Sequence, residues 1–259
     1  MGNIEWGHNK KVISDAELNQ SGLFADFNKR TLDDEFQGSY KDVKFKICET
    51  QLLFETEYGG KRGIVSVFKG VIMFFDLGRT IKSRTIISTK GDWTQKNTYW
   101  LYLMPFSYVL IELATKENFN TILIAAILLF IVAGIYLVVF KGVFNKKEKP
   151  LNRVNLEDPK FNKKFDVFSS DQLEARYFAT PAFMERFQNL KTAFGAKKAK
   201  CAFYNDKLMI AISTNKNLFE IGQVYKTLDN PDTIHSFCNE ISSIYEMIEY
   251  FKLDEKFYL

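Results

Sequence analysis

The chain has 259 residues, of which 46% are hydrophobic and 25% are charged, and this balance excludes a disordered or fibrous protein. Its three cysteines, Cys48, Cys201 and Cys238, lie far apart without a Cys-x-x-Cys motif, so they predict neither a disulfide framework nor a zinc site. The net charge of +4 is concentrated in residues 141–164, directly after the most hydrophobic part of the chain. A basic segment in this position favours a membrane surface over nucleic acid as the partner.

The N-terminal part, residues 1–96, is predicted to form a short helix followed by β-strands. Ser14 and Glu17 have the spacing of a helix capping box. Glycines 59, 60 and 63 predict a hairpin connection between two strands. A phosphate-binding loop is the alternative for this GGKRG sequence, but the spacing of a P-loop is absent. The segments with strand-like patterning are 43–49, 51–58, 63–75 and 84–89.

Two hydrophobic stretches follow and predict a transmembrane helical hairpin. Residues 118–140 carry no charge and form about 34 Å of helix, enough to cross a hydrocarbon core of about 30 Å. Residues 97–115 contain only Glu112 as a charged residue and reach about 28 Å. A membrane-lying or buried helix is the alternative for this first stretch. Because lysines precede the first stretch and follow the second, we expect both flanking parts in the cytoplasm.

Residues 142–259 contain the signals of several short elements. Ser169 and Gln172 have the spacing of a capping box, with Asp171 suited to the first turn of the same helix. A second helix is predicted to begin at Pro181 with Thr180 as its N-cap.

Two further elements complete this C-terminal part. A β-hairpin is predicted to turn at Asn205 and Asp206. The last helix, over 231–252, has apolar residues at helical spacing, among them Ile234, Ile241 and Ile248. We expect this helix face to pack on the protein's own sheet, and pairing with a partner helix is the alternative.

The sequence contains no recognisable catalytic or metal-binding motif. His235 and Cys238 lie three residues apart on the predicted last helix, but a Cys–His pair needs an orienting group and an oxyanion site. Adjacent carboxylates such as Asp33 and Asp34 do not have the spacing of an acid–base pair. We therefore predict no catalytic residue, no metal ligand and no cofactor.

Residues 154–187, VNLEDPKFNKKFDVFSSDQLEARYFATPAFMERF, resemble a bacterial family of uncharacterised, membrane-associated proteins, domain-of-unknown-function family three-one-three-seven. The segment VFKGVI at 67–72 is also similar to that family. The resemblance covers most of residues 13–253 and implies that the parts before and after the hydrophobic stretches are halves of one domain. It brings no known catalytic residues. The motif residues that carry it are Phe68, Lys69, Gly70, Glu157, Asp158, Pro159, Phe161, Asp171, Glu174, Arg176, Tyr177 and Pro181.

One feature departs from the family pattern. Family members carry their membrane helices before the domain, whereas here the hydrophobic stretches lie between the VFKG and LEDP motifs. Either an N-terminal part is missing or the anchor has moved into a loop of the domain, and both explanations stay open.

These observations predict an α+β protein whose split, mainly antiparallel sheet with packed helices is interrupted by the transmembrane hairpin. Residues 1–96 and 142–259 are the two halves of a cytosolic domain, and residues 97–141 are the hairpin. We expect a non-enzymatic binding or scaffold module at the bacterial inner membrane, with a membrane protein as a further partner and no nucleic acid. The alternatives are an enzyme without a recognisable signature and a lipid-sensing domain.

The lipid bilayer is the expected partner of the basic segment that follows the second stretch. We expect Lys141, Lys146, Lys147 and Lys149 to contact anionic headgroups at the membrane surface. The alternative is that these lysines act only as topology signals.

Overall fold

The computed structural model describes residues 3–8, 11–58, 61–78, 80–92, 134, 150–216 and 231–255. The chain divides into two compact units, residues 1–93 with 151–259, and residues 94–150. Both predicted transmembrane stretches lie in the second unit and, except for Gly134, outside the described residues. Among the helices that the structure describes, none combines the length and the apolar character needed to cross a membrane.

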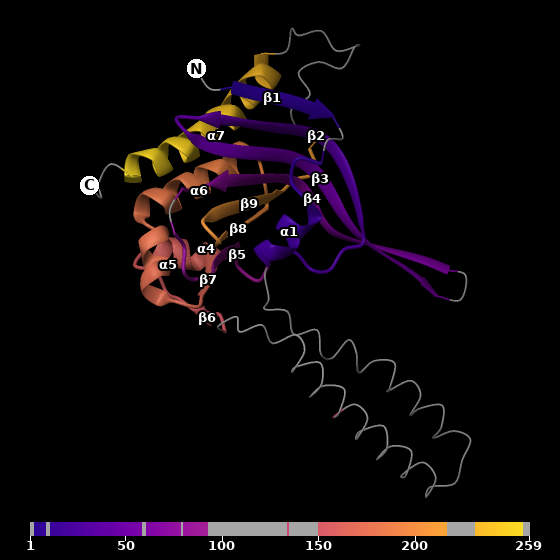
Figure 1. The fold of residues 1–259 in the computed structure, drawn as a ribbon, viewed down its shortest axis with the longest axis horizontal. Coiled ribbons are helices and arrows are strands. Elements are labelled where there is room, and N and C mark those ends of the chain that lie inside the picture. The colour runs from indigo at the N-terminus through magenta and orange to yellow at the C-terminus, as the bar shows by residue number, and fades with distance from the viewer. Residues whose placement is uncertain are drawn as a thin grey trace, which may run out of the picture. The chain divides into compact units, whose positions relative to one another are not determined.

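The first unit contains one nine-stranded antiparallel sheet and several helices, so the prediction of an α+β fold is confirmed (Figure 1). The strand order is β1-β2-β3-β4-β9-β8-β5-β7-β6. The strands are β1 (Asn3–His8), β2 (Lys29–Tyr40), β3 (Val43–Tyr58), β4 (Lys61–Asp76), β5 (Thr85–Thr89), β6 (Asn152–Arg153), β7 (Phe165–Ser169), β8 (Lys198–Tyr204) and β9 (Lys207–Ser213). The helices are α1 (Asp15–Ser21), α4 (Pro159–Lys164), α5 (Gln172–Phe178), α6 (Pro181–Ala193) and α7 (Pro231–Glu255).

Strands from before and after residues 94–150 alternate in this sheet. β4 pairs with β9, and β5 lies between β8 and β7. Both segments therefore contribute to one set of backbone hydrogen bonds. The pairs β4–β9, β5–β8 and β5–β7 each need one strand from either segment.

The structure corrects the predicted strands of the N-terminal part. The segments 43–49 and 51–58 form one strand, β3, with a shift in its pairing to β4 between Leu52 and Leu53. β1 and β2 were not predicted. The side chains of β2 are mostly exposed or half-buried, so this strand lacks the apolar alternation by which a strand is recognised.

The two faces of the sheet are covered differently. Successive residues of a strand point to opposite faces, and the two faces carry separate hydrophobic clusters. One cluster includes residues of α4 to α7 and is rich in phenylalanine, with Phe183 and Phe187 stacked at 5.8 Å between ring centroids. The other cluster includes α1, and there Phe24 meets the edge of Phe68 at 5.1 Å.

The last helix packs within the unit, but not as predicted in detail. α7 lies chiefly along α6, with only a small contact to β3, and Figure 1 shows the two helices side by side. Met247 and Ile248 are fully buried, whereas Ile241 is only half-buried. The hydroxyls of Thr180 and Tyr250 lie 2.7 Å apart and join the start of α6 to α7.

Most predicted caps and turns are confirmed. Ser14 and Glu17 form the capping box of α1, and Thr180 caps α6 ahead of Pro181. Asn205 and Asp206 have φ angles of 46° and 62° in the β8–β9 turn, as the two central residues of a tight hairpin turn require.

The predicted cap of α5 is wrong. Asp171 is the N-cap, and its carboxylate accepts the backbone N–H groups of Leu173 and Glu174. Ser169 instead ends β7, where its hydroxyl accepts the backbone N–H of Asp171 and donates to the carbonyl of the same residue.

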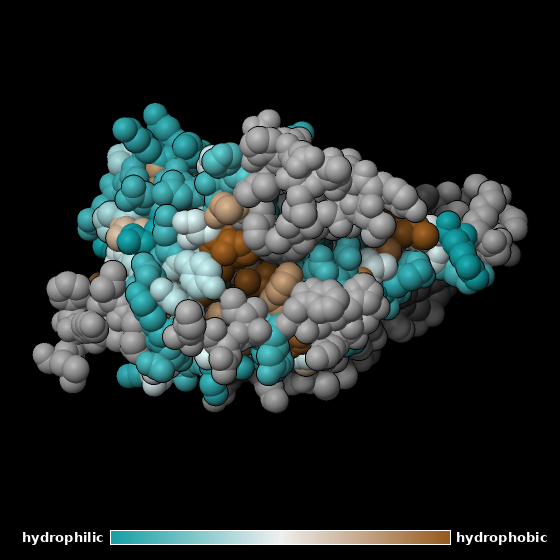
Figure 2. Space-filling view, turned by 90° about the horizontal axis from the view of Figure 1, so that it is seen from above, coloured by the Kyte–Doolittle hydropathy of each residue, from teal (hydrophilic) through white to brown (hydrophobic). Residues whose placement is uncertain are grey.

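β3 and β4 continue beyond their neighbours as a two-stranded arm, residues 54–58 and 61–65. β2 pairs with β3 only as far as Leu53, and β9 pairs with β4 only from Gly70 onward. The arm exposes three large hydrophobic residues, Phe54, Ile64 and Val65. Figure 1 shows the arm projecting to the right of the sheet, and Figure 2 shows hydrophobic residues on it in the right part of the view.

Candidate functional site

The residues predicted to contact the membrane, Lys141, Lys146, Lys147 and Lys149, lie outside the described residues. Their role stays a prediction. The family-motif residues all lie within the described part of the chain, and most of them have a structural role.

Gly70 and Phe68 allow β4 to pack closely in the sheet. Gly70 has a φ angle of 144°, and a Cβ atom at this position would lie 2.1 Å from the carbonyl oxygen of Ile212. Only glycine permits this approach of β4 to β9. Phe68 is buried in the α1-side cluster.

Several motif residues of the C-terminal part begin helices. Asp158 caps α4 ahead of Pro159, and Asp171 caps α5. Pro181 is the first residue of α6. Each cap satisfies backbone N–H groups that have no partner within the helix.

Two other motif residues join elements to one another. Glu174 accepts the backbone N–H of Lys82 at 3.0 Å and so ties α5 to the loop before β5. Phe161 is fully buried and stacks on Phe165 at 4.5 Å.

The remaining motif side chains, those of Lys69, Glu157, Arg176 and Tyr177, are exposed. They come from β4, the loop before α4, and α5, and the structure does not gather them into one site. Arg176 and Tyr177 share α5 with Leu173, whose side chain is 78% exposed. Most residues of the motif therefore have a role in the fold.

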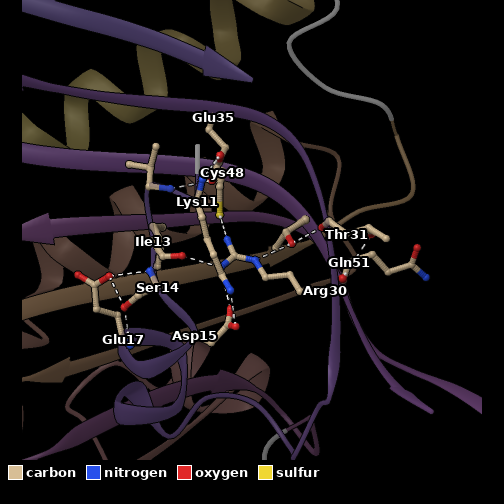
Figure 3. A network of polar contacts seen from close by, with 12 residues as sticks. Lys11, Ile13, Ser14, Asp15, Glu17, Arg30, Thr31, Glu35, Cys48 and Gln51 are labelled. Atoms are coloured by element: carbon tan, nitrogen blue, oxygen red, sulfur yellow. Dashed lines mark hydrogen bonds and ion pairs between the residues drawn. The ribbon is translucent and has the colours of Figure 1, made fainter. Parts of the chain in front are cut away.

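A buried polar network fastens the segment before α1 to the sheet (Figure 3). The guanidinium of Arg30 donates to the carbonyl of Ile13, to Asp15, to the hydroxyl of Thr50 and to the sulfur of Cys48. The carboxylate of Glu35, which is fully buried, accepts the backbone N–H groups of Lys11 and Val12 at 2.7 and 3.0 Å. These partners are all protein groups, so the network stabilises the fold.

Cys48 and Cys201 do not have the properties of catalytic nucleophiles. Burial raises the pKa of Cys48 to about 12, and burial likewise raises the pKa of Cys201. A thiol must ionise to react. His235 and Cys238 are exposed on α7, and within the described ranges no cluster of His, Cys, Asp or Glu could hold a metal ion.

The two points at which residues 94–150 join the first unit are fastened by one carboxylate. Asp166, on β7, accepts the backbone N–H of Gly91 at 3.2 Å and pairs with Arg153 at 2.7 Å. Gly91 follows β5 and precedes these residues, whereas Arg153 comes just after them. Both ends of the intervening segment therefore start from neighbouring places in one rigid structure.

Asp92 is also fixed at this junction. It pairs with Lys198 at 2.7 Å and with Lys200 at 3.9 Å. Lys200 is buried, with its ammonium 5.1 Å from the ring centroid of Phe24. Burial lowers the pKa of Lys200, an effect that Asp92 opposes and Lys198 reinforces.

Lysines that are exposed, or in the case of Lys191 half-buried, surround this junction at one end of the sheet, where β5 and β9 end and β7 and β8 begin. We call this the lysine end. The backbone N–H of Lys90 donates to the carbonyl of Lys164, and the ammonium of Lys216 lies over Gly195. Burial and the nearby charge of Lys164 lower the pKa of Lys191. The lysines of this end are Lys90, Lys163, Lys164, Lys191, Lys197, Lys198 and Lys216.

Sequence reasoning recognised only part of this cluster. Lys163 and Lys164 belong to the basic segment identified above, but Lys90, Lys191 and Lys216 are dispersed in the sequence. Each of these three lies near the end of a strand or helix. That signal becomes informative only when the strand pairing is known.

The comparisons with known proteins identify the family. A family model described as "Protein of unknown function (DUF3137)" matches residues 66–253. No curated protein and no solved structure matches the chain. Because the family model covers well over half of the sequence, the chain belongs to this family of proteins of unknown function.

Proposed function

We propose that the chain is a membrane-anchored, non-enzymatic binding or scaffold module at the cytoplasmic face of the bacterial inner membrane. The observation that supports this most strongly is the junction at Asp166, which holds Gly91 and Arg153 together. A segment whose two ends start from one folded unit must cross a membrane an even number of times. A single crossing would separate strands that pair in one sheet.

The intervening residues have the length and composition for two crossings. They contain the uncharged stretch 118–140 and the stretch 97–115 with one charged residue, each close to the length that spans a bilayer. Lysines flank both ends of this pair, which is the charge distribution of a hairpin with both ends in the cytoplasm. We propose this topology for the two stretches.

A binding role, with a membrane protein as the further partner, accounts for the surface features better than catalysis does. The buried carboxylate of Glu35 and the buried guanidinium of Arg30 both fasten the N-terminal segment to the sheet. The conspicuous surface features are the lysine end and the apolar arm. Both features expose side chains that a partner could contact, so they favour a binding role over catalysis.

Thiol labelling tests the proposed topology. Cys238 is exposed and reports on the C-terminal half, and Arg62→Cys in a Cys238→Ser background places a thiol on the exposed arm of the N-terminal half. Cys48 and Cys201 are buried and stay silent. We expect a membrane-impermeant maleimide to label neither site in intact spheroplasts and both sites in inverted vesicles. Lys116→Cys, in the predicted outer loop, is the positive control and labels in spheroplasts.

Labelling of only one half in spheroplasts would contradict two crossings. Labelling of both halves in spheroplasts would place the domain outside the cytoplasm.

We also propose that Lys141, Lys146, Lys147 and Lys149 lie on anionic headgroups. A spin label tests this when placed at Asn155, which is exposed, because Val154 is buried. Replacing the last three lysines with glutamine should raise the mobility of the label in anionic bilayers, and salt should have the same effect. Equal mobility in neutral and anionic bilayers would show that the lysines are only topology signals.

A further inference from the structure

We propose that the lysine end is a second membrane contact, through which the folded unit lies on the anionic phospholipid headgroups of the bilayer that anchors the chain. This proposal rests on the membrane anchoring proposed above. It assigns a partner to lysines of the folded unit, which are distinct from those at 141–149.

The pairing of the strands places these lysines on one continuous surface. Thr89, the last residue of β5, pairs with Phe165, the first residue of β7. On the other side of β5, the hydroxyl of Thr89 accepts the backbone N–H of Ala199 near the start of β8. Lys90, Lys164 and Lys198 are each next in sequence to one of these three residues. They therefore lie at the ends of three adjacent strands.

The helix α6 and the segment after β9 extend this surface. Lys191, in the last turn of α6, has its ammonium 5.6 Å from the ring centroid of Phe165 at the start of β7. The ammonium of Lys216 lies close to Gly195, which follows α6. Five segments of the chain therefore contribute positive charge to the same end of the unit.

Few carboxylates neutralise this charge. Asp92 pairs with Lys198, and Asp166 is engaged by Arg153. Within the described part of the chain, no carboxylate forms an ion pair with Lys90, Lys163, Lys164, Lys191, Lys197 or Lys216. Burial and, secondarily, the nearby charge of Lys164 lower the pKa of Lys191. A surface of this kind is completed by an anionic partner.

The length of the connecting chain limits how far this surface lies from the bilayer. Asp92 pairs with Lys198, and the predicted first membrane stretch begins at Asn97. Five residues span at most about 18 Å when fully extended. If the stretch from Asn97 enters the bilayer, the lysine end lies near the headgroups.

The side chains at this end suit headgroup phosphates better than nucleic acid. They are lysines, which act as compact and strongly hydrated point charges. Nucleic-acid-binding surfaces add aromatic side chains on which bases stack, and the aromatic residues that the structure describes here, Phe165 and Phe194, are buried. An acidic protein is an alternative that the experiment distinguishes.

The experiment measures lysine acetylation of the full chain in nanodiscs by an amine-reactive reagent, with each lysine quantified by mass spectrometry. The bilayers are phosphatidylcholine alone or mixed with phosphatidylglycerol, neither of which has a primary amine. We expect Lys90, Lys163, Lys164, Lys197 and Lys216 to react about fivefold more slowly in the anionic bilayer at low salt. High salt should remove the difference, because it screens the attraction. The matched controls are Lys44 and Lys82, which are exposed away from the lysine end and should react equally in both bilayers.

A charge-reversal variant gives an independent measurement. In a Cys238→Ser background, a spin label at Asn215→Cys, an exposed position beside Lys216, should be less mobile in anionic than in neutral nanodiscs. The triple variant Lys163→Glu, Lys164→Glu and Lys197→Glu should abolish this difference. The control variant Lys44→Glu with Lys82→Glu should keep it.

Four results would overturn the proposal. Equal protection of the lysine end in neutral and anionic bilayers would mean that something other than lipid charge covers it. Protection by polyglutamate or a single-stranded oligonucleotide, without protection by the anionic bilayer, would assign the surface to a protein or a nucleic acid. Extraction of the chain from membranes by alkaline carbonate would refute the anchoring, and the proposal with it. A chain that resists extraction but shows no protection leaves the anchoring intact and refutes only the lipid contact.

Discussion

The two ends of the sheet differ in how their charged side chains are paired. At the end where β8 finishes and β9 begins, which we call the paired end, several charged side chains have partners. Glu17 pairs with Lys46, and Lys41 pairs with Glu249. The carboxylate of Asp206 accepts the backbone N–H of Ile81 at 2.6 Å. At the lysine end, most lysines have no carboxylate partner among the described residues.

If the lysine end contacts lipid as proposed, stability and recognition are assigned to different ends. Pairing at the paired end fastens α1, α7 and the loop before β5 to the sheet. Uncompensated like charges at the lysine end destabilise the fold slightly through repulsion. A protein retains such a cluster where a partner supplies the opposite charge, and the chain leaves the folded unit at this same end.

The largest expected effect comes from adding a side-chain atom at Gly70, where the backbones of β4 and β9 approach closely. Gly70→Ala places a Cβ atom 2.1 Å from a backbone carbonyl oxygen at a φ angle of 144°, so we expect the free energy of unfolding to fall by about 4 kcal/mol or more. Urea denaturation measures it. The control is Gly63→Ala in the arm, where the nearest atom is the side-chain oxygen of Thr56 at 3.1 Å. Equal effects of the two substitutions would show that the close approach at Gly70 is unimportant.

The next effect concerns α7, which Glu249 connects to the paired end. Ile248 is fully buried, so Ile248→Ala should lower the free energy of unfolding by about 3 kcal/mol. Ile241 is half-buried, so Ile241→Ala should lower the free energy of unfolding clearly less than Ile248→Ala does. Thermal unfolding of both variants measures the difference. The reverse order would mean that the exposed side of α7 is held by a partner.

A matched pair of carboxylates compares the two ends directly. Asp166→Asn at the lysine end and Asp206→Asn at the paired end each replace a carboxylate that accepts a backbone N–H with an uncharged amide, which is a weaker acceptor. Each substitution should lower the free energy of unfolding by about 1–2 kcal/mol. Hydrogen exchange should then accelerate locally, at Gly91 in the first variant and at Ile81 in the second. Acceleration at both sites in either variant would mean that the ends are coupled.

The smallest effects are opposite responses of α1 and of the lysine end to pH. Burial raises the pKa values of Asp15 and Glu17, but hydrogen bonds from lysine, arginine and serine outweigh it and lower them below 3.8 and 4.5. Because these pKa values are lowered in the folded state, their contribution to stability is present above about pH 4.5 and is lost as the pH falls further. The protection factors of the α1 amides, which correct for the intrinsic pH dependence of exchange, should therefore fall in acid. Glu17→Gln should remove part of this pH dependence.

At the lysine end the sign is reversed. The pKa values of Lys191 and Lys200 are lowered from 10.5, first by burial, so the folded state disfavours their charged forms. The resulting penalty is present at neutral pH and is relieved as the pH rises towards 10.5. The urea midpoint of Lys191→Gln should rise less between pH 8 and 10 than that of the unmodified chain. An equal rise would show that Lys191 carries no such penalty.

Several local features could be predicted from the sequence because they depend on residues within one or two turns. Ser14 with Glu17, Thr180 with Pro181, and the pair Asn205 and Asp206 were assigned correctly. Ser169 was not, because its hydroxyl bonds to Thr85 on a neighbouring strand. Of the candidate site, Lys163 and Lys164 were recognised in advance as part of a basic segment, and Lys90 as a lysine before the first hydrophobic stretch.

The sequence by itself determined the α+β class, most of the caps and turns and the family, because each follows from the types of residue at short, regular spacing. Only the tertiary structure decided that β8 and β9 insert between β4 and β5, that Gly91 and Arg153 meet at Asp166, and that dispersed lysines form one end of the unit. These features depend on pairing between residues that are far apart in the sequence, in some cases by more than a hundred positions. That pairing is set by the summed packing of both faces of the sheet, and no short segment of the sequence encodes it.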